Sequence, residues 1–201
     1  MSMGFKKAYG KAAAALIRIY IRVVYRPECI NLEAGERPVI YVSNHISHLD
    51  GLLMLTALHS ERPYALTAKD WFDKKFLGPV FEAARCLPIN RFGLDTSWLR
   101  GASEKLRAGK SVIVFPEGHT VHSGELDEFK PGFAMLAKLT GAPVVPVWHG
   151  PGRVFRKTKV VFGPASCVEL PSMTSEALRR EGERFRGMVE ALGRQNGGGE
   201  V

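Results

Sequence analysis

The chain has 201 residues, of which 45% are hydrophobic and 24% charged, a balance that excludes a disordered or fibrous protein. A chain of this length buries roughly 70% of its unfolded surface, so one domain with an internal pocket needs no disulfide or metal for stability. The three cysteines are far apart and form no C-x-x-C motif, which argues against a secreted disulfide scaffold. The net charge of +8 favours an anionic partner: nucleic acid, a phosphorylated substrate, an acidic carrier or an anionic membrane.

Residues 4–26 are predicted to form one amphipathic helix that ends before Pro27. Its apolar side chains recur every three or four positions and lie on one stripe, with basic residues near the opposite side. Such a helix suits either the surface of an anionic membrane or packing on its own domain. No apolar run reaches the roughly 18 residues of a spanning helix, and arginines interrupt any secretory signal, so we expect neither. The stripe consists of Phe5, Tyr9, Ala12, Leu16, Ile19 and Val23.

Short β-branched runs alternate with helical patterns along the rest of the chain. The expected fold is therefore α/β: a single domain with a mostly parallel sheet flanked by helices, preceded by the amphipathic N-terminal helix. We expect residues 27–193 to form this domain and residues 194–201 a flexible tail. Strands are predicted at 39–43, 65–68, 86–89, 111–115, 144–147 and 159–162, and helices at 50–60, 71–84, 96–108, 129–140 and 175–192.

The first of these strands leads directly into His45, and a helix begins near Asp50. Residues five positions apart on a regular helix lie about 140° from each other, so the two side chains cannot share a helical face. They can meet if His45 lies in the loop and the Asp50 carboxylate accepts a hydrogen bond from one imidazole nitrogen. The other nitrogen is then a proton acceptor, as in the paired base and orienting acid of acyl-transfer enzymes.

Two further predicted strands also end in polar residues. Glu117 and Gly118 follow strand 111–115, and Arg91 follows strand 86–89. Because the carboxyl ends of parallel strands meet at one edge of a sheet, we expect these residues to line one crevice with His45. The Arg91 guanidinium can bind a phosphate through two hydrogen bonds. No serine or cysteine stands in a nucleophile motif, so the nucleophile is expected to belong to the substrate, for example an alcohol that attacks a thioester.

A metal-dependent hydrolase is an alternative, because segments 45–50 and 117–122 contain histidine and carboxylate side chains, which are common metal ligands. Neither of these two segments has the form H-E-x-x-H. A basic domain that binds nucleic acid without catalysis is a third class, but the sequence contains no recognised nucleic-acid module, so we expect no nucleic-acid partner. The metal-compatible residues are His45, His48, Asp50, Glu117, His119 and His122.

Four segments in this order resemble the glycerolipid acyltransferase family, typified by 1-acyl-sn-glycerol-3-phosphate acyltransferase. The resemblance spans residues 38–150 and implies an O-acyltransferase of phospholipid biosynthesis. Such an enzyme moves a fatty acyl group from acyl-CoA or acyl carrier protein to the free hydroxyl of a lysophospholipid such as 1-acyl-glycerol-3-phosphate. It implies no cofactor and no metal. The segments are Asn44-His45-x-x-x-x-Asp50, Ile89-Asn90-Arg91, Phe115-Pro116-Glu117-Gly118 followed by Phe129-Lys130-x-Gly132, and Val144-Val145-Pro146-Val147.

The resemblance implies that His45 is the general base and that Asp50 orients it. We therefore expect residues 27–193 to be an acyltransferase domain, and the amphipathic helix at 4–26 to place it on the cytoplasmic face of a membrane. Two departures bear on the acceptor: the arginine expected at position 120 is replaced by Thr120, and Asn90 precedes Arg91 where aspartate is usual. The acceptor therefore stays open between lysophosphatidate, another lysolipid and a non-phosphorylated amphiphile. The residues expected at the acceptor site are Arg91, Glu117, Gly118 and Lys130.

Overall fold

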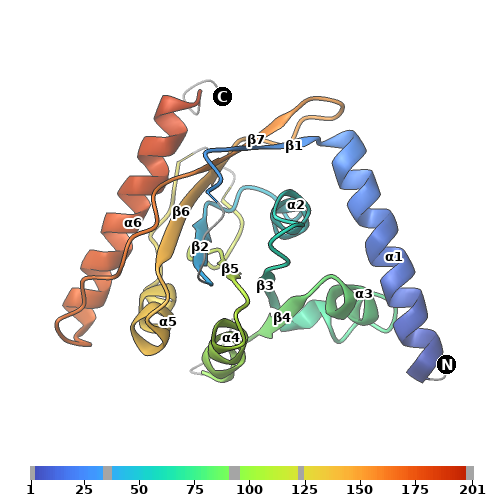
Figure 1. Cartoon of the computed structure of the whole chain (residues 1–201), viewed down its shortest axis with the longest axis horizontal. Coiled ribbons are helices and arrows are strands. Elements are labelled where there is room, and N and C mark those ends of the chain that lie inside the picture. The colour runs from blue at the N-terminus through green and yellow to red at the C-terminus, as the bar shows by residue number, and fades with distance from the viewer. Residues whose placement is uncertain (1–2, 34–37, 91–95, 122–124, 198–201) are drawn as a thin grey trace.

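A seven-stranded sheet with the strand order β1-β7-β6-β2-β5-β3-β4 forms the centre of the computed structural model (Figure 1). The structure describes residues 3–33, 38–90, 96–121 and 125–197. The strands are β1 (Pro27–Ile30), β2 (Ile40–Ser43), β3 (Tyr64–Ala68), β4 (Cys86–Ile89), β5 (Val112–Val114), β6 (Val144–His149) and β7 (Thr158–Phe162). The helices are α1 (Met3–Val24), α2 (Asp50–Ala57), α3 (Gly78–Ala83), α4 (Ser97–Arg107), α5 (Gly132–Thr140) and α6 (Ser175–Gln195), with a 3-10 helix η1 (Lys69–Trp71).

The prediction of a mostly parallel sheet flanked by helices is confirmed. Strand β2 pairs in parallel with both β5 and β6, β5 pairs in parallel with β3, and only β6 and β7 run antiparallel among the described pairs. Strand β1, which was not predicted, pairs in parallel with β7 at the edge. Because β6, β2 and β5 are parallel neighbours, their carboxyl ends lie together at one edge of the sheet.

Side chains of β2 alternate between the two faces of the sheet, as the period of two along a strand requires. Ile40 and Val42 join a buried cluster with α4, α5 and α6, whereas Tyr41 joins a second cluster with α1 and α2. Figure 1 shows these two groups of helices on opposite sides of the sheet. Burial on both faces explains why the central strands are runs of apolar residues rather than alternating patterns.

The predicted helix at 71–84 is wrong in its first half. The short helix η1 ends at Trp71, residues 72–77 form turns and a bend, and α3 begins only at Gly78. Pro79 lies in the first turn of α3, where its missing N–H costs no hydrogen bond, and it cannot continue a helix that began earlier. Pro131 delays α5 in the same way, so that this helix begins at Gly132 rather than at 129.

Helix α1 packs against α3 and α2 through a face that the apolar stripe does not occupy. Gly10 lies so close to Pro79 of α3 that a Cβ atom at position 10 would be 2.2 Å from the proline carbonyl oxygen. Ile21 and Val24 complete this face and are buried. The close approach of α1 and α3 therefore depends on a residue without a side chain.

The apolar stripe of α1 points away from the domain. Phe5, Leu16, Ile19 and Val23 are 56% to 67% exposed. With about 100° between successive residues, the helix has three faces: one that packs, one that is apolar and exposed, and one that carries the basic residues. No helix in the described part of the chain is long and apolar enough to span a membrane.

Phe185 on α6 offers a test of the core, because its ring is fully buried and packs edge-on against Phe133 of α5 at 5.3 Å between ring centres. We expect Phe185→Ala to lower the free energy of unfolding by about 3–5 kcal/mol, measured by urea denaturation, because it leaves a cavity. Phe76→Ala removes a ring that is 59% exposed and should change stability by no more than about 0.5 kcal/mol. Equal losses for the two variants would contradict this packing.

Candidate active site

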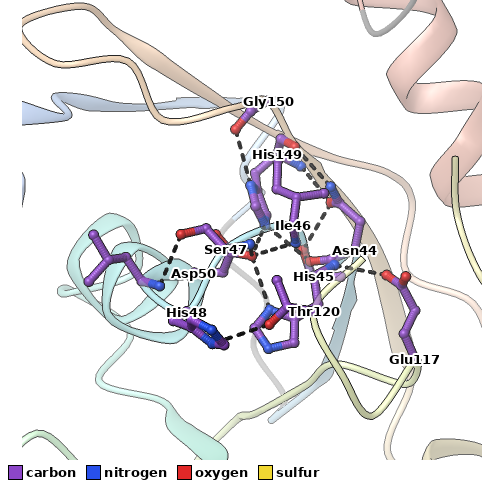
Figure 2. A network of polar contacts seen from close by, with 12 residues as sticks. Asn44, His45, Ile46, Ser47, His48, Asp50, Glu117, Thr120, His149 and Gly150 are labelled. Carbon is purple, nitrogen blue, oxygen red and sulfur yellow. Dashed lines mark hydrogen bonds and ion pairs between the residues drawn. The ribbon is translucent and has the colours of Figure 1, made fainter. Parts of the chain in front are cut away.

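Three neighbouring strands bring the polar residues of the site together. Asn44 and His45 follow β2, Glu117 follows β5, and His149 ends β6. Asp50 opens α2 and completes the group. Figure 2 shows the five side chains and the hydrogen bonds that join the loops at this edge of the sheet.

The predicted hydrogen bond between His45 and Asp50 is confirmed, with 3.0 Å between Nδ1 and Oδ2. The same carboxylate oxygen accepts the backbone N–H groups of Ile46 and Ser47, each at 2.7 Å, so Asp50 also fixes the loop that carries the histidine. The ring of Phe115 stacks on the imidazole at 4.6 Å between ring centres. Among the described residues, none bonds to Nε2 of His45, which is therefore available to a substrate.

Asp50 is 4% exposed and is ionised despite its burial. Burial alone would raise the pKa of Asp50. The charge of His149 and the hydrogen bonds from His149, His45 and the backbone of Ser47 outweigh that effect and lower the pKa well below its ordinary value. A carboxylate in this state accepts the Nδ1 proton of His45 and leaves the lone pair on Nε2, which is the form a general base needs.

Glu117 connects two loops rather than pointing into open space. Its side chain is buried, Oε1 accepts the N–H of His45 at 2.8 Å, and Oε2 accepts the N–H of Asp127 at 3.3 Å. Burial raises the pKa of Glu117, although the two backbone hydrogen bonds oppose this. The assignment of Glu117 to the acceptor site stays a prediction. Its hydrogen bond to the N–H of His45 indicates that it positions the backbone of that residue.

Two residues without a predicted role, His149 and Asn44, also belong to this group. The Asn44 side chain donates to the carbonyl oxygen of His149 and accepts its N–H, both at 2.9 Å. In return, the buried His149 ring lies 3.1 Å from the carbonyl oxygen of Asn44 and 3.4 Å from Asp50, both measured from Nε2. A histidine at the end of an apolar strand was the only signal in the sequence, and strand-end histidines are not by themselves diagnostic.

A cavity of about 490 Å³ opens beside His45. Most of its lining is apolar, and it extends between β3, β4, the segment 71–84 and the inner face of α1, where Ile17 contributes. Cys86 also lines it, and burial raises the pKa of this thiol to about 11, so the thiol is protonated and acts as an apolar wall. An apolar cavity next to a polar pair can hold a hydrocarbon chain while exposing one end of it to the imidazole.

Of the predicted acceptor residues, Gly118 and Lys130 line this cavity. Gly118 has a φ of +75°, and a Cβ there would lie 2.7 Å from Nζ of Lys130, so glycine allows both the turn and the approach of the amine. Thr120, at the position where the resemblance leads one to expect arginine, bonds to His48 at 3.3 Å. Arg91 lies outside the described residues.

The metal-hydrolase alternative is not supported by this arrangement. No group of three or more histidine, cysteine, aspartate or glutamate side chains converges as a metal site within the described ranges. His45 and Asp50 bond to each other, Glu117 bonds to backbone N–H groups, and His119 pairs with Asp127 at 3.1 Å. His122, the remaining residue of the alternative, lies outside the described residues.

Comparison with known proteins identifies relatives of similar sequence and fold. The chain is 33% identical over 120 residues to the chloroplastic 1-acyl-sn-glycerol-3-phosphate acyltransferase BAT2 of Brassica napus. The aligned region covers 58% of this chain and 34% of the Brassica protein. The chain is also 30% identical over 148 residues to a probable 1-acyl-sn-glycerol-3-phosphate acyltransferase of Mycoplasma genitalium. That aligned region covers 71% of this chain and 54% of the Mycoplasma protein. The chain thus spans about a third to a half of the length of these curated relatives.

Among solved structures, the 1-acyl-sn-glycerophosphate acyltransferase PlsC of Thermotoga maritima superimposes with a TM-score of 0.61 and 23% identity. The match covers 94% of this chain and 78% of that one, and it shows that the two share a fold. The family model named Acyltransferase matches residues 19–150, which include β2, β5, β6 and all the polar residues of the site. Because this match covers well over half of its length, the chain belongs to the Acyltransferase family.

Proposed function

We propose that this protein transfers a fatty acyl group from a thioester to the free hydroxyl of a lysophospholipid such as 1-acyl-glycerol-3-phosphate. The observation that carries the proposal is the His45–Asp50 pair at the wall of an apolar cavity. Direct transfer, in which the acceptor hydroxyl itself attacks the thioester, needs a base and room for a hydrocarbon chain. Nε2 of His45 and the apolar cavity supply these, and the described site contains no protein nucleophile. The relatives named as 1-acyl-sn-glycerol-3-phosphate acyltransferases support the acceptor class.

In the proposed reaction, Nε2 of His45 takes the hydroxyl proton as the acceptor oxygen attacks the thioester carbonyl. The carbon–sulfur bond then breaks, an ester forms, and the imidazolium returns the proton to the leaving thiolate. The N–H of Asp50 donates to the carbonyl oxygen of Ser47. The oxyanion that forms on the attacked carbonyl would therefore accept a hydrogen bond from the next N–H of α2, that of Gly51, which lines the cavity. Asp50 keeps the imidazole in the required tautomer throughout.

Lys130 is the described cation best placed for an acceptor phosphate. It is exposed, lies beside Gly118 and lines the same cavity as His45. Arg91 is proposed as a second phosphate ligand on the strength of its sequence motif. The positive charge of Lys130 favours a phosphorylated acceptor over a neutral amphiphile.

Acyl-CoA and acyl carrier protein are both proposed as donors, because each presents an acyl thioester on an anionic carrier that suits the basic surface. The protein would work at the cytoplasmic face of a membrane, where acceptor and product partition. The exposed apolar face of α1, with basic residues beside it, supports peripheral attachment at this surface.

Mass spectrometry of the lipids formed by the purified full chain tests the proposal. The chain is incubated with lysophosphatidate, other lysophospholipids or monoacylglycerol, each with acyl-CoA or acyl carrier protein as donor. We expect phosphatidate as the main product with at least one donor. Hydrolysis of the thioester without any acylated lipid would contradict the proposed function.

His45→Ala should lower kcat by about three orders of magnitude, because the hydroxyl loses its base. The assay is acyl transfer to lysophosphatidate under saturating donor and acceptor, with circular dichroism to confirm the fold. The matched control is His59→Ala, which replaces an exposed histidine on the loop after α2 and should retain wild-type turnover. Turnover within tenfold of wild type for folded His45→Ala would remove His45 from catalysis.

Lys130→Gln should raise KM for lysophosphatidate by about tenfold, because a charge-assisted hydrogen bond to phosphate is lost. KM for monoacylglycerol should stay unchanged, since that acceptor has no phosphate. Lys110→Gln, in an exposed lysine that does not line the cavity, is the control. An unchanged KM for lysophosphatidate in Lys130→Gln would refute the phosphate contact.

Membrane attachment is best tested by surface substitutions, because deletion of residues 1–26 would also remove the buried Ile21 and Val24. The double variant Leu16→Ser, Ile19→Ser should reduce sedimentation with phosphatidylglycerol vesicles by tenfold or more, since each apolar side chain contributes about 1.5–3 kcal/mol on burial. Leu139→Ser removes a leucine of α5 that is 55% exposed and should leave binding unchanged. Wild-type sedimentation of the double variant would exclude α1 as the anchor.

A further inference from the structure

His149 is a fully buried titratable group that the proposed reaction does not use, although it touches the group that orients the base. The side chain is 1% exposed, and its environment comes from the end of β6, the loop after β2 and the start of α2. Its Nδ1 lies 3.2 Å from the carbonyl oxygen of Gly150. Its Nε2 lies 3.1 Å from the carbonyl oxygen of Asn44 and 3.4 Å from Oδ2 of Asp50.

Both ring nitrogens of His149 therefore face groups that can only accept hydrogen bonds. A neutral imidazole has one nitrogen with a lone pair, and that lone pair would point at a carbonyl or carboxylate oxygen. An imidazolium has a proton on both nitrogens and satisfies every contact. Burial opposes a positive charge, but the adjacent carboxylate and the two carbonyl oxygens outweigh it and raise the pKa of His149.

We propose that His149 is a positioning residue that remains an imidazolium and forms a buried ion pair with Asp50, so that His45 stays neutral and able to act as a base. The inference rests on the proposed acyl-transfer function. Asp50 bonds to His45 on one side and contacts His149 on the other (Figure 2). An unpaired carboxylate would stabilise the protonated form of His45, whereas the positive charge of His149 offsets that attraction.

The described titratable groups that act on this pair are few. His45 faces Asp50 from the loop after β2, and Glu117 approaches from the loop after β5 with its carboxylate on the N–H of His45. Glu117 is present in wild type and variant alike, so a change at position 149 alters only the charge beside Asp50. Without His149, protonated His45 gains stability, and the enzyme should lose its base at a higher pH than wild type does.

The test is His149→Gln, whose side-chain amide can reach the place of Nε2 and donate a hydrogen bond without carrying charge. The pH profile of kcat/KM for acyl transfer is measured for the full-length variant. We expect the midpoint of the acidic limb to move up by about one pH unit relative to wild type. His59→Gln is the control for loss of a histidine elsewhere and should leave the profile unchanged.

A fall in kcat/KM by the same factor at every pH would mean that His149 supports only the fold, and an unchanged profile would mean that it has no role; either result overturns the proposal. Nitrogen-15 NMR of the wild-type imidazole rings is a second test that needs neither a folded variant nor activity. It should show protons on both nitrogens of His149 from about pH 5 to about pH 8. A single proton on that ring across this range would overturn the ion pair even if the proposed function holds.

Discussion

The site depends on one buried carboxylate, that of Asp50. Its Oδ2 atom accepts hydrogen bonds from the His45 ring and from the N–H groups of Ile46 and Ser47, and it faces the His149 ring. Burial of a lone carboxylate would cost several kcal/mol, so the charge is tolerated only because these donors surround it. The same contacts fold the loop between β2 and α2 and connect it to β6. The orientation of the His45 ring and the local fold of this loop thus both depend on the Asp50 carboxylate.

The rest of the molecule supports this interaction with rigid elements. Strands β6, β2 and β5 are buried on both faces, so the loops at their carboxyl ends are held by the packed core. The apolar cavity begins at His45 and reaches Ile17 on the inner side of α1, whose outer side carries the exposed apolar stripe. One helix therefore contributes both to the cavity wall and to the surface proposed to meet the membrane.

The sequence predicted the α/β fold, the parallel sheet and the His45–Asp50 hydrogen bond, because apolar periodicity and strand-end positions are local signals. It did not predict β1, which is a four-residue edge strand, or the start of α3, where Pro79 lies in the first turn and prevents the helix from beginning earlier. The apolar stripe of α1 was identified, but the packing face was not, since its closest contact with α3 is made by Gly10, which carries no hydrophobic signal. His149 was missed because its partners, Asn44 and Asp50, lie about a hundred residues earlier and are brought to it only by strand pairing.

Asp50→Asn isolates the role of the buried carboxylate, because it keeps the size of the side chain and removes its charge. The measurement is kcat for acyl transfer from a thioester to lysophosphatidate, with near-ultraviolet circular dichroism as a check on the fold. We expect a folded protein whose kcat is lower by about a thousandfold or more, since a neutral amide neither fixes the His45 tautomer nor stabilises the imidazolium that forms when His45 takes the proton. A folded variant with kcat within tenfold of wild type would contradict the claim that the buried carboxylate orients the catalytic base.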